Sequence, residues 1–209
     1  MTAMFPLQSA LLPGETLPLN IFEPRYARLV QDCMASADPT FGVVQISQGL
    51  EVGGDDTRSD VGTLARISRC TDLGMGQYQL LSSVGERIRV LEWLPDDPYP
   101  RAVVQAWPDD PGPPVTPERI GEVVDGILGL FRRLIEARGG RLRSDALAVE
   151  ADIADDPSRH VYALAARVPI GQADRYAVLA APTLSERVDV LTDAIETVTA
   201  MVEFQLSEE

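Results

Sequence analysis

Few residues of this chain are suited to chemistry, and their spacing argues against a catalytic centre. The sequence has one histidine, His160, and no lysine, so a histidine triad has one candidate base and lysine-dependent chemistry has none. His160 stands among Val161, Tyr162 and Leu164 in a helical pattern, which favours a partly buried structural histidine. The sequence contains neither a G-x-S-x-G elbow nor a phosphate-binding glycine motif. We therefore expect no catalytic residue and no enzymatic activity.

Residues that bind metals are equally scattered. Cys33 and Cys70 form no C-x-x-C pair and lie in apolar segments, so we expect buried, reduced thiols. Paired aspartates recur in loops rich in proline or glycine, at Asp55–Asp56, Asp96–Asp97, Asp109–Asp110 and Asp155–Asp156. None has the spacing of a calcium-binding loop, so we interpret them as solvated turn residues and helix caps. The sequence thus predicts neither a metal site nor a bound cofactor.

The charge of the chain excludes several classes of partner. Its 32 acidic residues outnumber its 18 arginines, which gives a net charge of −14. The excess is the same on either side of residue 115, so no basic module is present. An acidic surface repels phosphate backbones and anionic lipids, so we expect neither nucleic acid nor membrane as a partner. The N-terminus lacks the features of a secretory signal, which favours a cytoplasmic location.

Hydrophobic periodicity predicts a β-rich first half. Residues 5–107 consist mainly of short alternating or β-branched runs separated by glycine and proline, a pattern typical of a small barrel or sandwich. One helix is expected to interrupt them, from Pro24 to a stop near Asp38–Pro39. Pro18 should confine its strand to a sheet edge or a bulge, and the glycines flanking Met75 predict a hairpin tip.

The second half reads as helical. We expect a β lobe over residues 1–107, a proline-rich linker over 108–117 and a helical lobe over 118–209. Helices are predicted after the capping residues Thr116 and Asp156, from about Gln172, and after a capping box that begins at Thr183. The last helix carries an apolar stripe of Leu184, Val188, Leu191, Ile195, Val198, Val202 and Leu206. This stripe is expected to seat in a bundle, with a homodimer through the helix as the alternative.

Several strings within residues 4–104 match motifs of one known family. The most specific is Leu12–Tyr26, which reads LPGETLPLNIFEPRY. It is similar to L-P-L-x-I-F-E-P-R-Y, the opening of the N-terminal domain of Lon proteases. The other matching strings, in order, are Met4–Leu7, Phe41–Val44, Val61–Ile67, Gly85–Val90 and Tyr99–Ala102. The helices after Asp156 look like the C-terminal helices of that domain, with weaker motifs.

The resemblance implies an α+β fold: a PUA-like six-stranded β pseudo-barrel with one inserted helix, followed by an α-helical lobe of about four helices. In full-length Lon proteases this domain helps to recruit substrates that bear degrons or exposed apolar segments. The chain ends at Glu209, and its lack of lysine is incompatible with the catalytic pair of that family's peptidase, so we expect a stand-alone, non-catalytic relative. The function implied is a protein- or peptide-binding module, acting as an adaptor to a separate ATP-dependent protease.

Exposed apolar residues in loops are the best candidates for such binding. We single out Leu11, Leu12, Leu73, Met75 and Tyr78, with Met75 foremost because a flexible thioether at a hairpin tip suits varied apolar partners. The alternative is a tip that folds back on the barrel. Two other function classes stay open: an RNA-binding protein, since PUA-like barrels often bind RNA, and an enzyme of unrecognised type.

Overall fold

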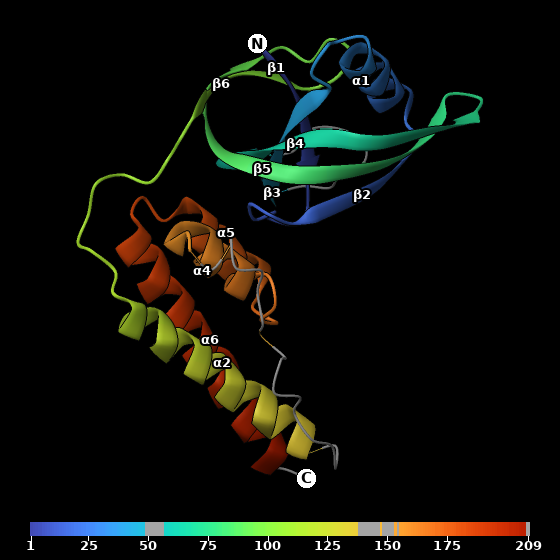
Figure 1. Cartoon of the computed structure of the whole chain (residues 1–209). Coiled ribbons are helices and arrows are strands. Elements are labelled where there is room, and N and C mark those ends of the chain that lie inside the picture. The colour runs from blue at the N-terminus through green and yellow to red at the C-terminus, as the bar shows by residue number, and fades with distance from the viewer. Residues whose placement is uncertain (49–56, 138–146, 148–152, 154, 208–209) are drawn as a thin grey trace. The chain divides into compact units, whose positions relative to one another are not determined.

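The chain folds into two compact units, Met1–Pro108 and Asp109–Glu209, in a computed structural model that describes residues 1–48, 57–137, 147, 153 and 155–207 (Figure 1). The first unit contains β1 (Thr2–Leu7), β2 (Thr16–Ile21), α1 (Pro24–Met34), β3 (Thr40–Gln48), β4 (Thr57–Gly74), β5 (Gln77–Leu94) and β6 (Arg101–Ala106). The second contains α2 (Pro117–Glu136), α4 (Pro157–Ala165), α5 (Gln172–Ala180) and α6 (Leu184–Ser207). The predicted α+β class is confirmed.

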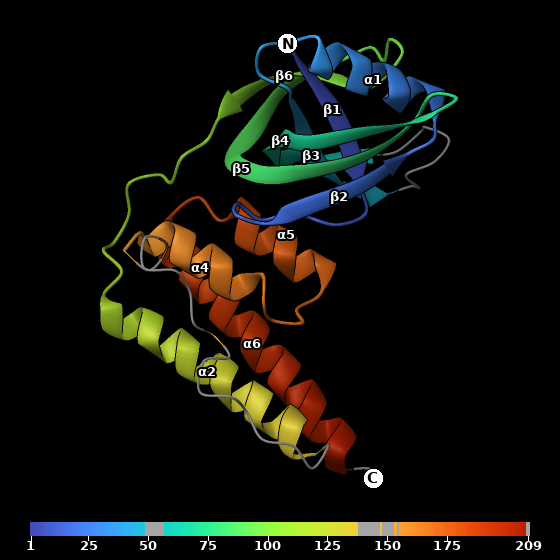
Figure 2. The ribbon, with the colours of Figure 1, turned by 45° about the vertical axis from the view of Figure 1, so that its right-hand side comes forward.

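The six strands form one mixed sheet that curls back on itself. Their order is β2-β5-β4-β3-β1-β6, and β6 also pairs with β5, which closes the sheet into a pseudo-barrel (Figure 2). Only β1 and β3 run parallel among these pairings. The predicted six-stranded pseudo-barrel with one inserted helix is therefore confirmed.

Local sequence signals account for several features of this sheet. Pro18 lies in β2, which is an edge strand, as expected for a residue that cannot donate a backbone hydrogen bond. The tip of the β4–β5 hairpin has positive φ angles at Gly74 (83°), Met75 (55°) and Gly76 (75°). Glycine adopts this left-handed region without strain, so the two glycines allow the turn that presents Met75.

The core of the first unit depends on close packing between strands and on stacked aromatic rings. Phe5 packs on Tyr26 of α1 with 4.2 Å between ring centroids, and on Phe41 of β3 with 6.1 Å. Strands β3 and β4 approach so closely at Gly62 that a Cβ atom there would lie 2.1 Å from the carbonyl oxygen of Val43. Glycine is required at this position because no larger residue fits the gap.

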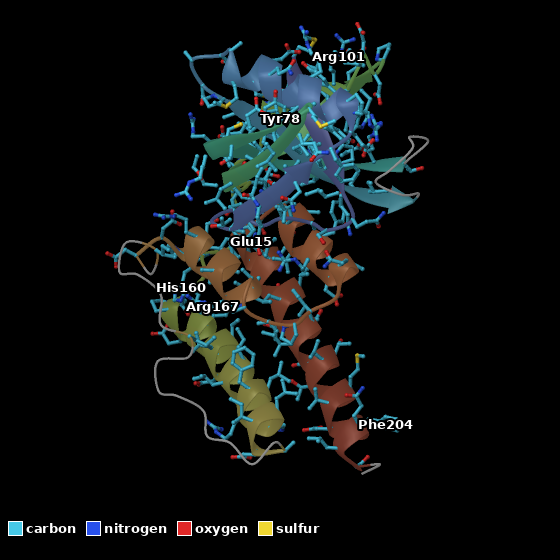
Figure 3. The ribbon with its side chains drawn as sticks, turned by 90° about the vertical axis from the view of Figure 1, so that its right-hand side faces the viewer. Glu15, Tyr78, Arg101, His160, Arg167 and Phe204 are labelled. Carbon is cyan, nitrogen blue, oxygen red and sulfur yellow. The ribbon has the colours of Figure 1, made fainter. Side chains whose placement is uncertain are left out.

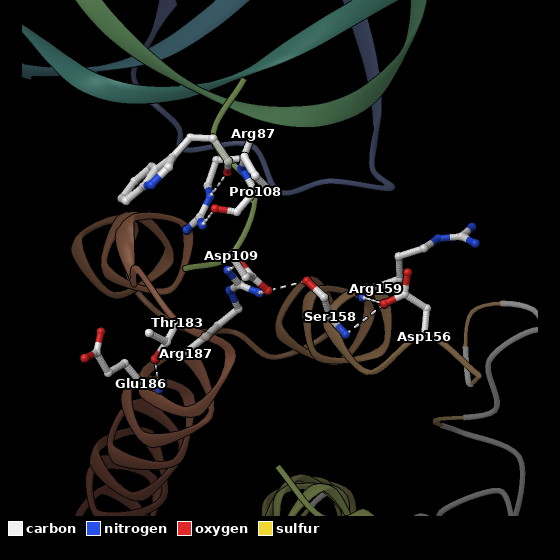
Figure 4. Close-up of polar contacts among 10 residues, drawn as sticks. Arg87, Pro108, Asp109, Asp156, Ser158, Arg159, Thr183, Glu186 and Arg187 are labelled. Atoms are coloured by element: carbon white, nitrogen blue, oxygen red, sulfur yellow. Dashed lines mark hydrogen bonds and ion pairs between the residues drawn. The ribbon is translucent and has the colours of Figure 1, made fainter. Parts of the chain in front are cut away.

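The helices of the second unit begin at the capping residues that the sequence indicates. The side chain of Thr116 accepts a hydrogen bond from the backbone N–H of Arg119 at the start of α2. The carboxylate of Asp156 accepts from two backbone N–H groups of α4, and the Thr183 hydroxyl accepts from the N–H of Glu186 in α6 (Figure 4). These bonds satisfy amides that a helix start leaves unpaired.

Helices α2 and α6 lie side by side and run in the same direction (Figure 1). Ion pairs join them near both ends, between Arg119 and Asp189 and between Arg133 and Glu203, the latter at 3.1 Å. The stripe on α6 seats mainly in the bundle, with its buried members being Val188, Leu191, Ile195 and Val202. Pairing of α6 with a second copy stays a prediction. Within the described residues, none of the helices combines the length and the apolarity needed to cross a bilayer.

A buried arginine holds the start of the second unit in place. Arg187 of α6 is 0 % exposed and pairs through its guanidinium with the carboxylate of Asp109. The same guanidinium donates to the Ser158 hydroxyl at 2.9 Å (Figure 4). It also lies 4.1 Å from the centre of the Tyr162 ring. One side chain thus links the first residue of the unit to α4 and α6.

The end of the first unit is held by a different arginine. Arg87 of β5 donates from Nε to the carbonyl oxygen of Trp107 at 2.9 Å and from Nη2 to that of Pro108 at 3.2 Å. Its guanidinium also stacks on the Trp107 ring at 4.1 Å. The carbonyl group of Pro108 and the side chain of Asp109, on the two sides of the peptide bond between residues 108 and 109, are therefore each held within their own unit.

Candidate functional site

Three exposed apolar side chains gather at one end of the barrel: Phe22, Leu73 and Met75, which we call the apolar rim. Their exposed fractions are 64 %, 59 % and 101 %. The strand register places Ile21 opposite Tyr78 and Gly74 opposite Gln77, so β2 ends at the same end of the sheet as the hairpin tip (Figure 1). Large apolar side chains that gather on a surface are typical of contact sites.

An apolar pocket of about 100 Å³ lies beside Phe22. It is lined by Phe5, Pro6, Leu7, Leu19, Asn20, Ile21, Phe22, Glu23 and Tyr26. This volume is smaller than the ~150 Å³ cavity that holds a benzene ring, so the pocket suits one aliphatic side chain. Its aromatic wall is preformed, because Arg25 stacks 4.6 Å above Tyr26 and is held by Glu23 at 3.0 Å. A rigid apolar pocket beside exposed apolar side chains can bind an apolar chain segment without rearranging.

The five residues singled out from the sequence do not share one surface. Leu73 and Met75 are exposed at the apolar rim. Tyr78 is half-buried next to the hairpin tip, and its hydroxyl accepts a hydrogen bond from Gln31 Nε2 at 3.1 Å (Figure 3). Leu11 is half-buried against the core. Tyr78 and Leu11 therefore offer a partner only part of their surface.

Leu12 requires a correction, because its side chain is 0 % exposed and is part of the core. The turn through Pro13 and Gly14 folds the chain back at this point, with a hydrogen bond from the N–H of Glu15 to the Leu12 carbonyl. In the other direction, the Leu12 N–H donates to the Glu15 carboxylate at 2.7 Å (Figure 3). Leu12 therefore has no part in the candidate surface.

Phe22 belongs to the apolar rim and was not among the residues singled out. The signal for it is present in the sequence, because residues 16–22 alternate between outward and inward positions. Leu17 and Ile21 are buried, so the alternation places Phe22 outward, at the solvent. The outward position of Phe22 is easily missed, because the apolar residues Leu17, Leu19 and Ile21 precede it.

Groups with perturbed pKa values in the first unit are structural. Burial, followed by the charge of Asp32, raises the pKa of the Cys33 thiol to about 11, so this thiol stays protonated and unreactive at neutral pH. Burial and a hydrogen bond to Asp32 raise the pKa of the Tyr99 hydroxyl to about 12. Among the residues that the structure describes, no group of three or more His, Cys, Asp or Glu side chains is placed to hold a metal ion.

His160 lies half-buried in α4 (Figure 3). Burial, and after it the charge of Arg167, lowers its pKa below the ordinary 6.5. Its imidazole is therefore neutral at neutral pH, as expected of a structural histidine.

Acidification through the titration range of His160 is expected to destabilise the second unit. The unfolded chain binds the proton more readily, so the stability due to the lowered pKa is present above pH 6.5 and lost as the pH falls through the folded pKa. We expect the free energy of unfolding to fall more between about pH 7.5 and 5.5 in the natural chain than in His160→Gln. Denaturant titrations at several pH values measure this difference, and equal slopes for the two proteins contradict it.

Comparisons with known proteins converge on one family. Residues 2–197 match the model of the ATP-dependent protease La (LON) substrate-binding domain. Lon protease 2 of Sorangium cellulosum is 30 % identical over 139 residues, which are 64 % of this chain and 17 % of that protein. Lon protease 1 of Herpetosiphon aurantiacus is 26 % identical over 199 residues, which are 92 % of this chain and 24 % of that protein. The chain thus spans about a fifth of the length of these curated relatives.

Two solved structures share the fold. A Lon N-terminal domain protein from Xanthomonas campestris has a TM-score of 0.60 and 26 % identity, with 92 % of this chain and 96 % of that chain covered. The N-terminal domain of the Lon protease of the Mycobacterium avium complex has a TM-score of 0.61 and 15 % identity, with 93 % and 97 % covered. The second likeness bears on the fold alone.

Proposed function

Because the chain belongs to the Lon substrate-binding domain family, we propose that it recognises apolar segments exposed by unfolded or degron-bearing proteins. The observation that carries this proposal is the apolar rim beside a preformed apolar pocket. Met75 projects entirely into solvent from the hairpin tip. Its unbranched thioether adapts to apolar surfaces of different shape, which suits a binder of many sequences.

The role in the cell that follows from this proposal is recruitment rather than chemistry. A member of a substrate-binding domain family that binds exposed apolar segments would deliver its cargo to an ATP-dependent protease. The even acidic charge supports this class of function over RNA binding, because phosphate contacts need clustered cations.

The test is the affinity for a permanently unfolded, apolar-rich polypeptide, measured by fluorescence anisotropy. The double variant Phe22→Ser/Met75→Asn should bind at least about tenfold more weakly, since each lost apolar contact removes on the order of 1 kcal/mol. Asparagine suits position 75 because it tolerates the positive φ of 55° found there.

The matched control is Leu91→Ser, which removes a side chain that is 58 % exposed on β5 outside the apolar rim. This variant should bind like the natural chain. Equal losses in the control and the double variant, or no binding by the natural chain, would refute the proposal.

A further inference from the structure

A second hollow, of about 180 Å³, opens on the outer face of the sheet and shares no residue with the apolar rim or its pocket. It is lined by Pro18, Arg69, Thr71, Gln79, Leu80 and Leu81. The register places five of these residues in two rows across β2, β5 and β4, whereas the side chain of Leu80 is buried in the core. One row contains Pro18, Leu81 and Arg69, and the next contains Gln79 and Thr71.

The lining of the hollow combines apolar surface with side chains that donate hydrogen bonds. Pro18 and Leu81 supply carbon surface, while the guanidinium of Arg69, the amide of Gln79 and the hydroxyl of Thr71 supply hydrogen-bond donors. No carboxylate lines the hollow. The volume is close to the ~150 Å³ that holds a benzene ring, so one apolar side chain fits.

Arg69 distinguishes this hollow from the other cationic positions on the strand. Arg66, three residues earlier on β4, pairs with Asp38, whereas Arg69 has no ion pair with any residue that the structure describes. An exposed arginine without an acidic partner is notable in a chain with a net charge of −14. Its charge complements an incoming anion, and a guanidinium fork matches a carboxylate in particular.

We propose that this hollow binds the C-terminal residue of a polypeptide whose last side chain is apolar. The side chain occupies the hollow, and the free α-carboxylate receives hydrogen bonds from Arg69 with Gln79 or Thr71 beside it. A terminal residue is the simplest ligand because it carries an apolar side chain and a carboxylate on one Cα atom. The inference rests on the proposed function, since it identifies a class of substrate: chains recognised by an apolar C-terminus.

The test compares two forms of one unstructured apolar peptide ending in leucine, one with a free carboxylate and one with a C-terminal amide. The free acid should bind about fivefold more tightly, the size expected of one solvent-accessible ion pair. Arg69→Gln should remove this difference while leaving the affinity for the amide unchanged. Arg132→Gln is the matched control, because it removes one charge from an exposed position on α2 and should preserve the preference.

The outcomes separate this inference from the proposed function. Equal binding of acid and amide by the natural chain overturns the inference and leaves recognition of apolar segments intact. Failure of the natural chain to bind either peptide overturns both. A third peptide, with a C-terminal amide and a glutamate beside the leucine, shows whether the hollow recognises the terminal carboxylate or a side-chain carboxylate. If its affinity equals that of the free acid, the hollow binds acidic side chains and the assignment to chain termini is wrong.

Discussion

Replacing Arg187 by methionine is expected to lower the free energy of unfolding of the second unit by about 3–5 kcal/mol. Methionine fills much of the same space, so the loss reports the interactions rather than a cavity. The guanidinium is fully buried and donates hydrogen bonds to both Asp109 and Ser158, and the variant loses these bonds. Asp109 keeps 25 % of its side chain exposed and regains some hydration, which places the effect toward the lower end of the range.

Chemical denaturation followed by far-ultraviolet circular dichroism measures this loss, since the second unit contributes four described helices. Arg133→Met serves as the control. Its ion pair with Glu203 has side chains that are 47 % and 54 % exposed, and pairs of this kind contribute less than about 1 kcal/mol. If both variants lose the same stability, burial of Arg187 adds nothing to its interactions and the expectation is wrong.

The second large effect is expected in the barrel, where Gly62→Ala should cost about 3 kcal/mol, the upper end of the usual range for overpacking. The new Cβ atom would lie 2.1 Å from the carbonyl oxygen of Val43 and 2.7 Å from Cγ1 of Val44. The oxygen belongs to the backbone of β3, so it cannot turn away as a side chain would. Relief requires β3 and β4 to separate locally, which weakens their hydrogen-bonded pairing.

The thermal unfolding midpoint provides the measurement, with Gly85→Ala as the control. A Cβ atom at Gly85 of β5 would meet only the carbonyl oxygen of Leu64, at 3.4 Å. That substitution should change the stability little, because alanine also restricts the unfolded chain. Similar midpoints for the two variants would mean that the strands move apart at little cost.

Features set by neighbouring residues were predictable from the sequence. The helix from Pro24, the caps at Thr116, Asp156 and Thr183, and the hairpin tip at Met75 all follow from local backbone chemistry. The resemblance to the Lon N-terminal domain added the number of strands and their closure into a pseudo-barrel, whereas periodicity alone leaves a barrel and a sandwich open.

Features that depend on residues far apart in the sequence were not predictable. Asp109 was interpreted as a solvated turn residue, yet it pairs with Arg187, 78 positions away. Arginine is almost never fully buried unless it is paired. Because the partner of Arg187 is distant in the sequence, no local pattern marks Arg187 as a core residue. The burial of Leu12 likewise depends on how its turn packs against the barrel. The exposure of Phe22, in contrast, follows from the alternation of residues along β2.

The fastening of the chain by Arg87 and Arg187 has a mechanical consequence. Flexible linkers lengthen under tension before the domains that they join bear any load. Here the held carbonyl of Pro108 and the held side chain of Asp109 belong to adjacent residues, whose Cα atoms are only about 3.8 Å apart. The connection has no slack to take up. Under the proposed function, a pull on a polypeptide bound by the barrel would therefore load the contacts of Arg87 and Arg187 first, without the extension of a flexible linker.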